Sequence, residues 1–245
     1  MTAQNPSLHR TRIKFCGITR LADARLAVEL GVDALGFVFA AQSPRYIEPA
    51  QAAAIRAALP PLVSIVALFQ NQDTARVRAV IELLRPDLLQ FHGSENAAYC
   101  EQFGLPYIKA VSMQTRFDPV SEGGKHPRAR ALLLDSHKPN GQGGTGQPFD
   151  WNEVPATVYN LILAGGLNDN NVARAIQMLK PYAVDVSSGI ETIVDGCAQP
   201  GIKDPERMRQ FVRAVRAAGR PPVYTLSLGF FLMGLFLWLL VLLKK

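Results

Sequence analysis

The sequence alternates between apolar runs and amphipathic stretches, and this alternation constrains the fold more than any other feature. The apolar runs are rich in Val, Ile, Leu and Ala, as the buried strands of parallel sheets are. Eight of them occur, at Ile13–Ile18, Ala34–Phe39, Leu62–Phe69, Leu88–His92, Tyr107–Val111, Ala131–Asp135, Leu161–Ala164 and Ala183–Ser187. Helical patterns lie between most of these runs and after the last one, at Leu21–Leu30, Ala50–Ala58, Asp73–Leu84, Glu95–Phe103, Asn168–Leu179 and Pro205–Ala218. Because eight β/α units close a barrel, we predict an α/β protein with the (β/α)8 TIM barrel fold.

One domain accounts for most of the 245 residues. No linker divides the chain before Arg220, and α/β barrels run to roughly 250 residues as single units, so residues 12–220 are predicted to form one catalytic barrel. Residues 1–11 are polar and lack the apolar core of a signal peptide, so we expect a flexible N-terminal tail and a cytoplasmic barrel. An open doubly wound sheet is the alternative, but its G-x-G-x-x-G turn is missing after Ile13–Ile18.

Several predicted helices have the residues that helix ends favour. Asp73 and Asn168 are predicted N-caps, because their short side chains can accept hydrogen bonds from backbone N–H groups of the first turn. Pro49 and Pro205 suit a first helical turn, where a missing N–H costs nothing. These signals support the division of the chain into the β/α units given above.

Composition and charge narrow the class of function. The formal net charge is +6, but the arginines are spread over many predicted helices without a basic run or interleaved aromatic residues, so we do not expect nucleic-acid binding. A mildly basic protein suits a small anionic substrate instead. Cys16, Cys100 and Cys197 are too few and too scattered for a disulfide framework or a zinc site, which favours a reducing compartment.

Polar residues stand where the predicted strands end, and in a barrel these ends share the face where function collects. Cys16 ends the first run, either as a small buried hydrophobe or as a reactive thiol. A thiol becomes a base only as the thiolate, so it needs a nearby cation, and Lys14 lies two residues back on the same strand face. Asp135 closes another apolar run, where it suits a general acid as well as a helix cap or an ion pair.

Binding groups are expected on the same face. Arg45 follows a proline in a loop, which suits a guanidinium presented to a carboxylate or phosphate, although a solvated surface arginine would look the same. His92 ends the fourth run and is a weaker candidate, since a strand-end histidine is often satisfied by backbone groups.

Small residues after the last two strands predict an anion site. Gly165 and Gly166 expose backbone N–H groups ahead of the next helix, and a tight turn is the simpler alternative. The eighth run continues through Asp185 into a second polar loop of Ser187, Ser188 and Gly189. Barrels often bind phosphate in the loops after their seventh and eighth strands, so a phosphorylated substrate is expected here.

Taken together, these stretches closely resemble the phosphoribosylanthranilate isomerases, (β/α)8-barrel enzymes of tryptophan biosynthesis. The resemblance covers the chain from about Arg12 to Ala218 and rests on several motifs in a fixed order. They are Lys14-Phe15-Cys16-Gly17-Ile18-Thr19-Arg20, Ser43-Pro44-Arg45-Tyr46, Gln90-Phe91-His92-Gly93, Leu133-Leu134-Asp135, Gly143-Gly144-Thr145-Gly146 with Phe149-Asp150-Trp151, Ala164-Gly165-Gly166-Leu167-Asn168 and Asp185-Val186-Ser187-Ser188-Gly189-Ile190-Glu191.

The resemblance implies an Amadori rearrangement, in which an aminoaldose becomes an aminoketose without a cofactor or metal. It gives Cys16 the role of general base at C2 and Asp135 that of general acid at the ring oxygen. It also implies that Arg45 holds the anthranilate carboxylate, that the loops after the seventh and eighth strands hold the phosphate, and that the Gly141–Gly146 loop closes over the substrate. The protein is expected to be a monomer or a homodimer.

Two other functional classes are alternatives. A different phosphosugar barrel is one, but an indole-glycerol-phosphate synthase would be expected to have a catalytic Lys/Glu set and a histidine-pathway isomerase a pair of aspartates. A membrane-tethered protein that only binds its ligand is the other. Binding alone requires neither Cys16 nor Asp135, so the presence of both favours the isomerase.

The C-terminal stretch does not fit the barrel pattern. Residues 223–243 contain 21 residues without a charge, which is long enough to span a bilayer core of about 30 Å. We therefore predict a hydrophobic C-terminal transmembrane helix that tethers the barrel to the cytoplasmic membrane, with residues 220–222 as the hinge. The alternative is a functionless extension from an altered reading frame.

Overall fold

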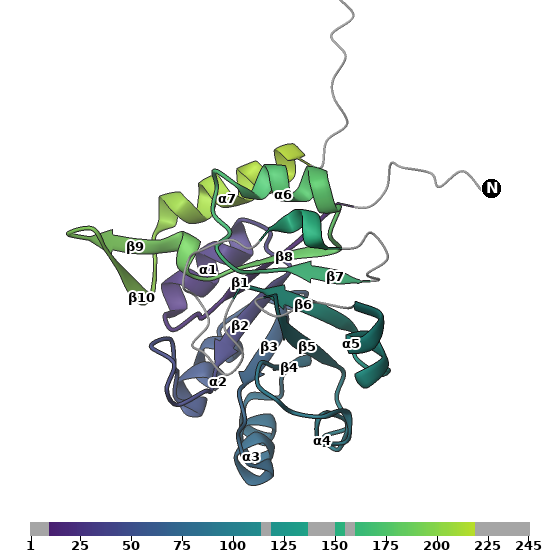
Figure 1. The fold of residues 1–245 in the computed structure, drawn as a ribbon. Helices are drawn as coiled ribbons and strands as arrows, with labels where there is room; N and C mark the ends of the chain where they lie inside the picture. Colours follow the sequence, from purple (N-terminus) through teal and green to yellow (C-terminus); the bar gives the residue numbers. More distant parts are fainter. Residues whose placement is uncertain (1–9, 114–118, 137–149, 155–159, 219–245) are drawn as a thin grey trace, which may run out of the picture.

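The computed structural model describes residues 10–113, 119–136, 150–154 and 160–218 of the chain. Eight parallel strands follow one another around a closed barrel, and pairing of β1 with β8 closes it (Figure 1). The strands are β1 (Arg12–Cys16), β2 (Ala34–Val38), β3 (Ser64–Phe69), β4 (Leu88–Phe91), β5 (Tyr107–Ser112), β6 (Ala131–Asp135), β7 (Leu161–Leu163) and β8 (Ala183–Val186). The predicted (β/α)8 TIM barrel is confirmed, and the open doubly wound sheet is wrong.

Helices surround the barrel on its outside (Figure 1). They are α1 (Leu21–Glu29), α2 (Pro49–Ala57), α3 (Thr74–Leu84), α4 (Ala97–Glu101), α5 (Pro119–Lys125), α6 (Val172–Leu179) and α7 (Pro205–Ala218), with short 3-10 turns at η1 (Trp151–Glu153) and η2 (Ser188–Ile190). Asp73 caps α3 as predicted, because its side chain accepts a hydrogen bond from the Arg76 backbone N–H. Asn168 does not cap α6. Its side chain instead accepts bonds from the N–H groups of Asn170 and Asn171, in a turn that precedes the helix.

A β-hairpin, which the sequence pattern did not predict, follows β8. Its strands are β9 (Glu191–Val194) and β10 (Cys197–Lys203), which pair in antiparallel fashion outside the barrel sheet. Asp195 and Gly196 connect them with positive φ angles of 50° and 78°. An Asp-Gly pair is a characteristic signal for a two-residue hairpin turn, so the element was readable although its flanking strands are short and partly exposed.

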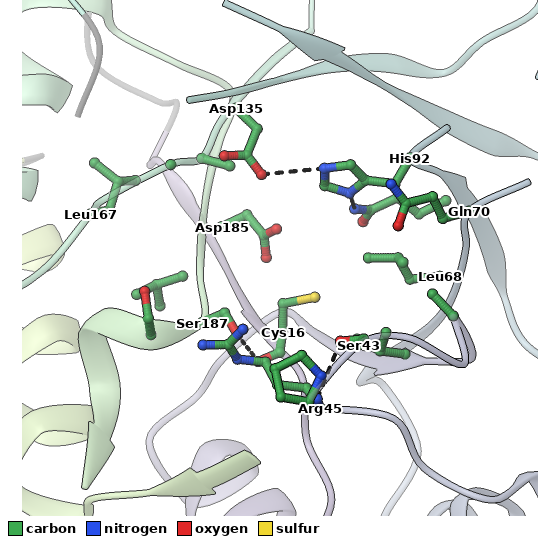
Figure 2. A pocket seen from close by; sticks show the side chains of 18 of the residues that line it. Cys16, Ser43, Arg45, Leu68, Gln70, His92, Asp135, Leu167, Asp185 and Ser187 are labelled. Carbon is green, nitrogen blue, oxygen red and sulfur yellow. Dashed lines mark hydrogen bonds and ion pairs between the residues drawn. The ribbon is translucent and has the colours of Figure 1, made fainter. Parts of the chain in front are cut away.

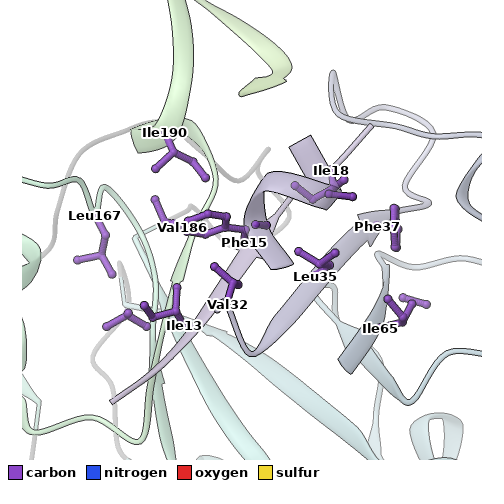
Figure 3. Close-up of a cluster of buried hydrophobic side chains, with 14 of the residues drawn as sticks. Ile13, Phe15, Ile18, Val32, Leu35, Phe37, Ile65, Leu167, Val186 and Ile190 are labelled. Carbon is purple, nitrogen blue, oxygen red and sulfur yellow. The ribbon is translucent and has the colours of Figure 1, made fainter. Parts of the chain in front are cut away.

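The barrel strands divide their side chains between two layers. Ile13 and Phe15 point outward from β1 into the main hydrophobic core (Figure 3). The Phe15 ring meets the Phe211 ring of α7 edge-on at a centroid distance of 6.1 Å. Because strand residues alternate, Lys14 and Cys16 lie on the other face, inside the barrel. This alternation is what allows an apolar strand to supply polar groups to a site.

Three predictions fall on residues outside the described part of the chain. They concern most of the N-terminal tail (residues 1–9), the Gly141–Gly146 loop and the hydrophobic stretch at 223–243. Among the helices that are described, none has both the length and the apolar character needed to span a bilayer.

Candidate active site at the carboxyl ends of the strands

A pocket lies at the carboxyl ends of the barrel strands and brings together almost all the predicted site residues (Figure 2). Strands β1, β2, β3, β4, β6 and β8 contribute residues to it directly, and the loops after β2, β3, β4, β7 and β8 contribute others. The predicted residues that line it are Cys16, Arg45, His92, Asp135, Gly165, Gly166, Asp185, Ser187 and Ser188. Gly189 follows Ser188 and does not itself line the pocket, and a Cβ atom there would lie 1.9 Å from the Leu167 carbonyl oxygen. Gly189 therefore allows the two loops to pack closely.

Cys16 lies beside a buried ion pair. Lys14 and Asp185 are register partners on β1 and β8, and the Lys14 Nζ atom lies 2.8 Å from Asp185 Oδ1. Gly36 of β2 makes room for this group, because a Cβ atom there would lie 2.8 Å from Cys16 Sγ and 3.0 Å from Lys14 Nζ. The predicted proximity of Lys14 and Cys16 is therefore confirmed. The ammonium group of Lys14 interacts with both the Cys16 thiol and the Asp185 carboxylate.

The charges around Cys16 oppose one another. Burial raises the pKa of the Cys16 thiol, Lys14 and the more distant Lys203 lower it, Asp185 raises it, and the net result is a pKa above the ordinary value. The pKa of Lys14 is also raised: burial lowers it, but Asp185 and Cys16 more than offset this effect. Both shifts favour the protonated form of the group concerned.

Asp135 enters the pocket from the end of β6 and interacts with His92. The His92 Nε2 atom lies 3.3 Å from Asp135 Oδ2 (Figure 2). On the other side of the ring, the Gln90 Nε2 atom lies 3.4 Å from His92 Nδ1. When the Gln90 amide donates to Nδ1, the ring proton is on Nε2, directed at Asp135. The arrangement orients the carboxyl group of Asp135, and its Oδ1 oxygen lies 2.9 Å from the Cβ position of Gly165.

The glycine loop after β7 has the shape expected of an anion cradle. Gly165 and Gly166 have φ angles of +78° and +66°, a conformation that other residues rarely adopt. A Cβ atom at Gly165 would lie 2.4 Å from the Ser136 backbone nitrogen, so the loop needs glycine for space as well as for conformation. α6 begins only at Val172, so the backbone of this loop, and not the helix end, faces the pocket.

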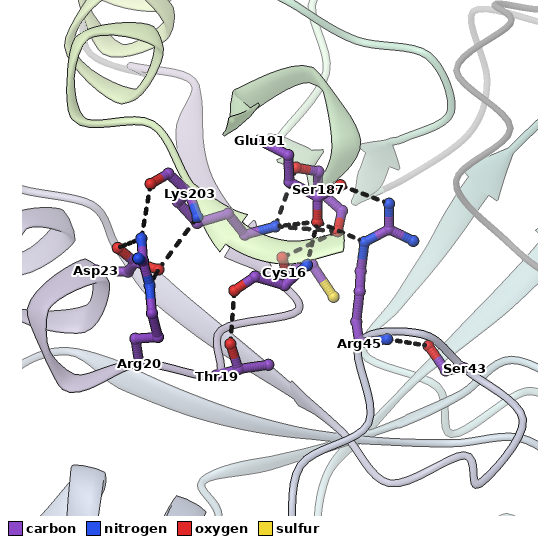
Figure 4. Close-up of polar contacts among 10 residues, drawn as sticks. Cys16, Thr19, Arg20, Asp23, Ser43, Arg45, Ser187, Glu191 and Lys203 are labelled. Carbon is purple, nitrogen blue, oxygen red and sulfur yellow. Dashed lines mark hydrogen bonds and ion pairs between the residues drawn. The ribbon is translucent and has the colours of Figure 1, made fainter. Parts of the chain in front are cut away.

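Arg45 and Ser187 take part in contacts that their sequence positions did not reveal (Figure 4). Arg45 forms a two-point ion pair with Glu191, with its Nε and Nη2 atoms 2.7 and 2.8 Å from the two carboxylate oxygens. The Ser187 hydroxyl donates a hydrogen bond to the Cys16 carbonyl oxygen at 3.0 Å. The hydroxyl proton of Ser187 therefore links the end of β8 to the end of β1. An anion bound at this loop would receive hydrogen bonds from the backbone N–H groups instead.

Two further residues, Gln90 and Glu191, take part in the site but were not predicted to do so. Gln90 is fully buried and lines the pocket, and its Oε1 atom has no hydrogen-bond partner among the described residues. The alternation of β4 predicts that Gln90 faces inward with His92, so it could have been found. Glu191 could not, because no local signal links it to Arg45. The described residues contain no group of three or more His, Cys, Asp or Glu side chains that could hold a metal ion.

Comparison with known proteins identifies the family. Residues 13–214 match the family model described as N-(5'phosphoribosyl)anthranilate (PRA) isomerase. A relative from Stenotrophomonas maltophilia (strain R551-3), named N-(5'-phosphoribosyl)anthranilate isomerase, is 50% identical over 215 residues, which cover 86% of this chain and 96% of the relative.

Solved structures agree with this assignment. Phosphoribosyl anthranilate isomerase from Thermus thermophilus is 38% identical and superimposes with a TM-score of 0.74, covering 84% of this chain and 99% of that structure. A phosphoribosyl anthranilate isomerase in complex with reduced 1-(o-carboxyphenylamino)-1-deoxyribulose 5-phosphate is 34% identical, with a TM-score of 0.70 and coverage of 84% and 99%. The chain therefore belongs to the N-(5'-phosphoribosyl)anthranilate isomerase family.

Proposed function

We propose that this isomerase of tryptophan biosynthesis converts N-(5'-phosphoribosyl)anthranilate into 1-(2-carboxyphenylamino)-1-deoxyribulose 5-phosphate by acid–base catalysis, with Asp135 as the acid and Cys16 as the base. One observation carries the proposal: Asp135 and Cys16 line the same pocket from β6 and β1, beside the glycine loop after β7. The reaction requires a proton donor, a proton acceptor and a grip on a doubly anionic substrate.

The proposed reaction assigns one proton transfer to Asp135 and one to Cys16. Asp135 gives a proton to the ribose ring oxygen, and the C1–O bond breaks to leave an open-chain iminium at C1. Cys16, as the thiolate, then removes the proton from C2, and the electron pair of that C–H bond forms an enaminol. Tautomerisation of the enaminol then moves a proton from the C2 hydroxyl to C1 and yields the ketone at C2, so no electron donor or acceptor is consumed.

Binding groups are assigned by their chemistry. The backbone of Gly165–Gly166 and of Ser187–Gly189 is proposed to hold the phosphate, because N–H groups of glycine-rich loops suit anions. Arg45 is proposed to hold the anthranilate carboxylate, and His92 and Asp185 to contact the opened sugar. A solved relative is in complex with reduced 1-(o-carboxyphenylamino)-1-deoxyribulose 5-phosphate, which carries both a phosphate and a carboxyl group, and this supports a ligand with both anionic groups.

Turnover of N-(5'-phosphoribosyl)anthranilate by the purified chain tests the proposal. Cys16→Ser and Asp135→Asn should each lower kcat at least 100-fold, the scale of a lost general base or acid. Cys197→Ser is the matched control, since Cys197 is exposed on β10 and outside the pocket, and it should keep the rate within about twofold. Near-normal rates in both site variants would overturn the assignment. Sedimentation of the same preparation distinguishes the predicted monomer from the homodimer.

A further inference from the structure

A buried ion network connects the β9–β10 hairpin to the pocket (Figure 4). Glu191 begins β9 and Lys203 ends β10, and the side chains of both are completely buried. Glu191 Oε1 accepts hydrogen bonds from Lys203 Nζ at 3.0 Å, from the Gly201 N–H at 2.8 Å and from Arg45 Nε at 2.7 Å. The second carboxylate oxygen accepts from Arg45 Nη2 at 2.8 Å. Of these three side chains, Arg45 is the one that lines the pocket.

We propose that Glu191 and Lys203 are positioning residues, which fix the guanidinium of Arg45 and preserve its charge for the aromatic carboxylate of the substrate. The inference rests on the proposed function, because it assumes that Arg45 meets that carboxylate. It adds a role for the hairpin, which supplies both positioning residues and would otherwise be only a connection between β8 and α7.

The hydrogen-bond donors of Arg45 support the positioning role. A guanidinium has five N–H groups in a fixed planar fork. Glu191 takes the Nε–H and one N–H of Nη2. Three donors are left over, one on Nη2 and two on Nη1, and they include the parallel pair at the outer edge of the group. That pair has the geometry for two-point binding of a carboxylate, and Glu191 fixes the direction in which it points.

The charges of the network support the second role. With Arg45 and Lys203 each at +1 and Glu191 at −1, the sum is +1, which equals the charge that one carboxylate would neutralise. Without Lys203, Glu191 would cancel Arg45 and the pair would have no net attraction for an anion. Burial lowers the pKa of Lys203. Three acceptors nevertheless surround its Nζ atom, namely Ser187 O, Ser187 Oγ and Glu191 Oε1, and they favour the charged ammonium form.

Close packing around Arg45 strengthens the constraint. A Cβ atom at Gly17 would lie 2.6 Å from Arg45 Cδ and 3.0 Å from Ser187 Oγ, so the arginine side chain rests directly on the backbone that follows Cys16. The aliphatic part of Arg45 thus packs on Gly17, directly after β1, and its charged end is bound by the hairpin. A side chain fixed at both ends loses little freedom when the ligand binds.

The experiment compares two ligands on the same variants. Glu191→Gln and Lys203→Met are made in the full-length chain. The dissociation constant is measured for reduced 1-(o-carboxyphenylamino)-1-deoxyribulose 5-phosphate and the inhibition constant for inorganic phosphate, which has no carboxylate. Each variant should bind the carboxylate ligand at least 10-fold more weakly and raise KM similarly. For Glu191→Gln, kcat should change less than threefold and phosphate inhibition should stay within twofold. Lys203→Met is judged on the carboxylate ligand alone, because it also removes contacts to Ser187 and a positive charge that acts on Cys16. Glu206→Gln, at an exposed ion pair on α7, is the matched control and should change none of these values.

The signs of these effects distinguish positioning from simple neutralisation. If Glu191 only offset excess positive charge, Glu191→Gln would bind the carboxylate ligand more tightly, and that result would overturn the proposal. Equal weakening of both ligands by Glu191→Gln would also overturn it, because it would show a general loss of structure. The double variant Arg45→Ala with Glu191→Gln should bind no more weakly than Arg45→Ala, since Glu191 acts through Arg45. Failure of the wild-type chain to turn over the substrate would instead refute the proposed function.

Discussion

At the scale of single residues, the absence of a side chain at Gly36 is as important to the site as the presence of Cys16. A Cβ atom on Gly36 would lie 2.8 Å from Cys16 Sγ and 3.0 Å from Lys14 Nζ. Both are buried on the inner face of β1 and have little room to move. Gly36→Ala is therefore expected to displace the thiol and its cation together, because a packed interior cannot absorb a methyl group without shifts.

The expected result for Gly36→Ala is at least a 10-fold loss of kcat/KM, with destabilisation of about 1–3 kcal/mol in chemical denaturation. Gly124→Ala is the control, because a Cβ atom at this position on α5 meets nothing within 4 Å. It should leave kcat/KM unchanged. An unchanged rate in Gly36→Ala would mean that the position of the Cys16 thiol does not limit turnover.

The pH dependence of the reaction follows from the raised pKa of Cys16. The thiolate is the basic form, so below this pKa its fraction grows about tenfold for each pH unit. The kcat/KM value should therefore rise with pH through the neutral range.

Lys14 lowers and Asp185 raises the pKa of Cys16. Lys14→Met should thus move the rising limb to higher pH, and Asp185→Asn should move it to lower pH. A limb that shifts the same way in both variants would contradict the assignment of Cys16 as the titrating base.

At the scale of elements, the N-cap of α3 gives the clearest local prediction. The Asp73 side chain accepts a hydrogen bond from the Arg76 N–H at 2.8 Å. Asp73→Ala removes it and should lower the free energy of unfolding by about 1 kcal/mol, measured by urea denaturation. Glu82→Ala, on the exposed side of the same helix, is the control and should change stability by less than about 0.5 kcal/mol. Equal effects of the two substitutions would show that the cap is unimportant.

The elements also explain what the sequence could predict. The eight barrel strands were readable because each is a short apolar run bounded by polar residues, and the inward direction of Cys16 and Lys14 followed from strand alternation. The ion pair of Arg45 with Glu191 spans 146 positions of sequence, and no local pattern encodes such a contact. The start of α6 was placed too early because Asn168 satisfies a turn of its own instead of the helix.

At the scale of the whole molecule, the site depends on closure of the barrel. β1 and β8 lie at opposite ends of the strand order, yet their pairing brings Lys14 against Asp185 and Cys16 against the loop of Ser187. Closure could be predicted from the number of strands, so the grouping of the strand-end residues could be predicted with it. The distribution of charge among Lys14, Cys16 and Asp185 could not, because it depends on distances that only the packed structure defines.

The hydrophobic stretch at 223–243 concerns the whole molecule because, as a membrane anchor, it would determine where the barrel resides. It follows α7, which ends at Ala218 and packs on α1 and α6, so the described barrel is complete before it begins. We predict that the full-length chain partitions into the membrane fraction, since 21 uncharged residues suffice to cross a bilayer. The 1–220 fragment should remain in the supernatant and keep its kcat and KM within about twofold.

Carbonate extraction of the pellet separates insertion from aggregation, because an inserted helix stays with the lipid. Equal partitioning of both chains into the supernatant would contradict the anchor and favour a functionless extension from an altered reading frame.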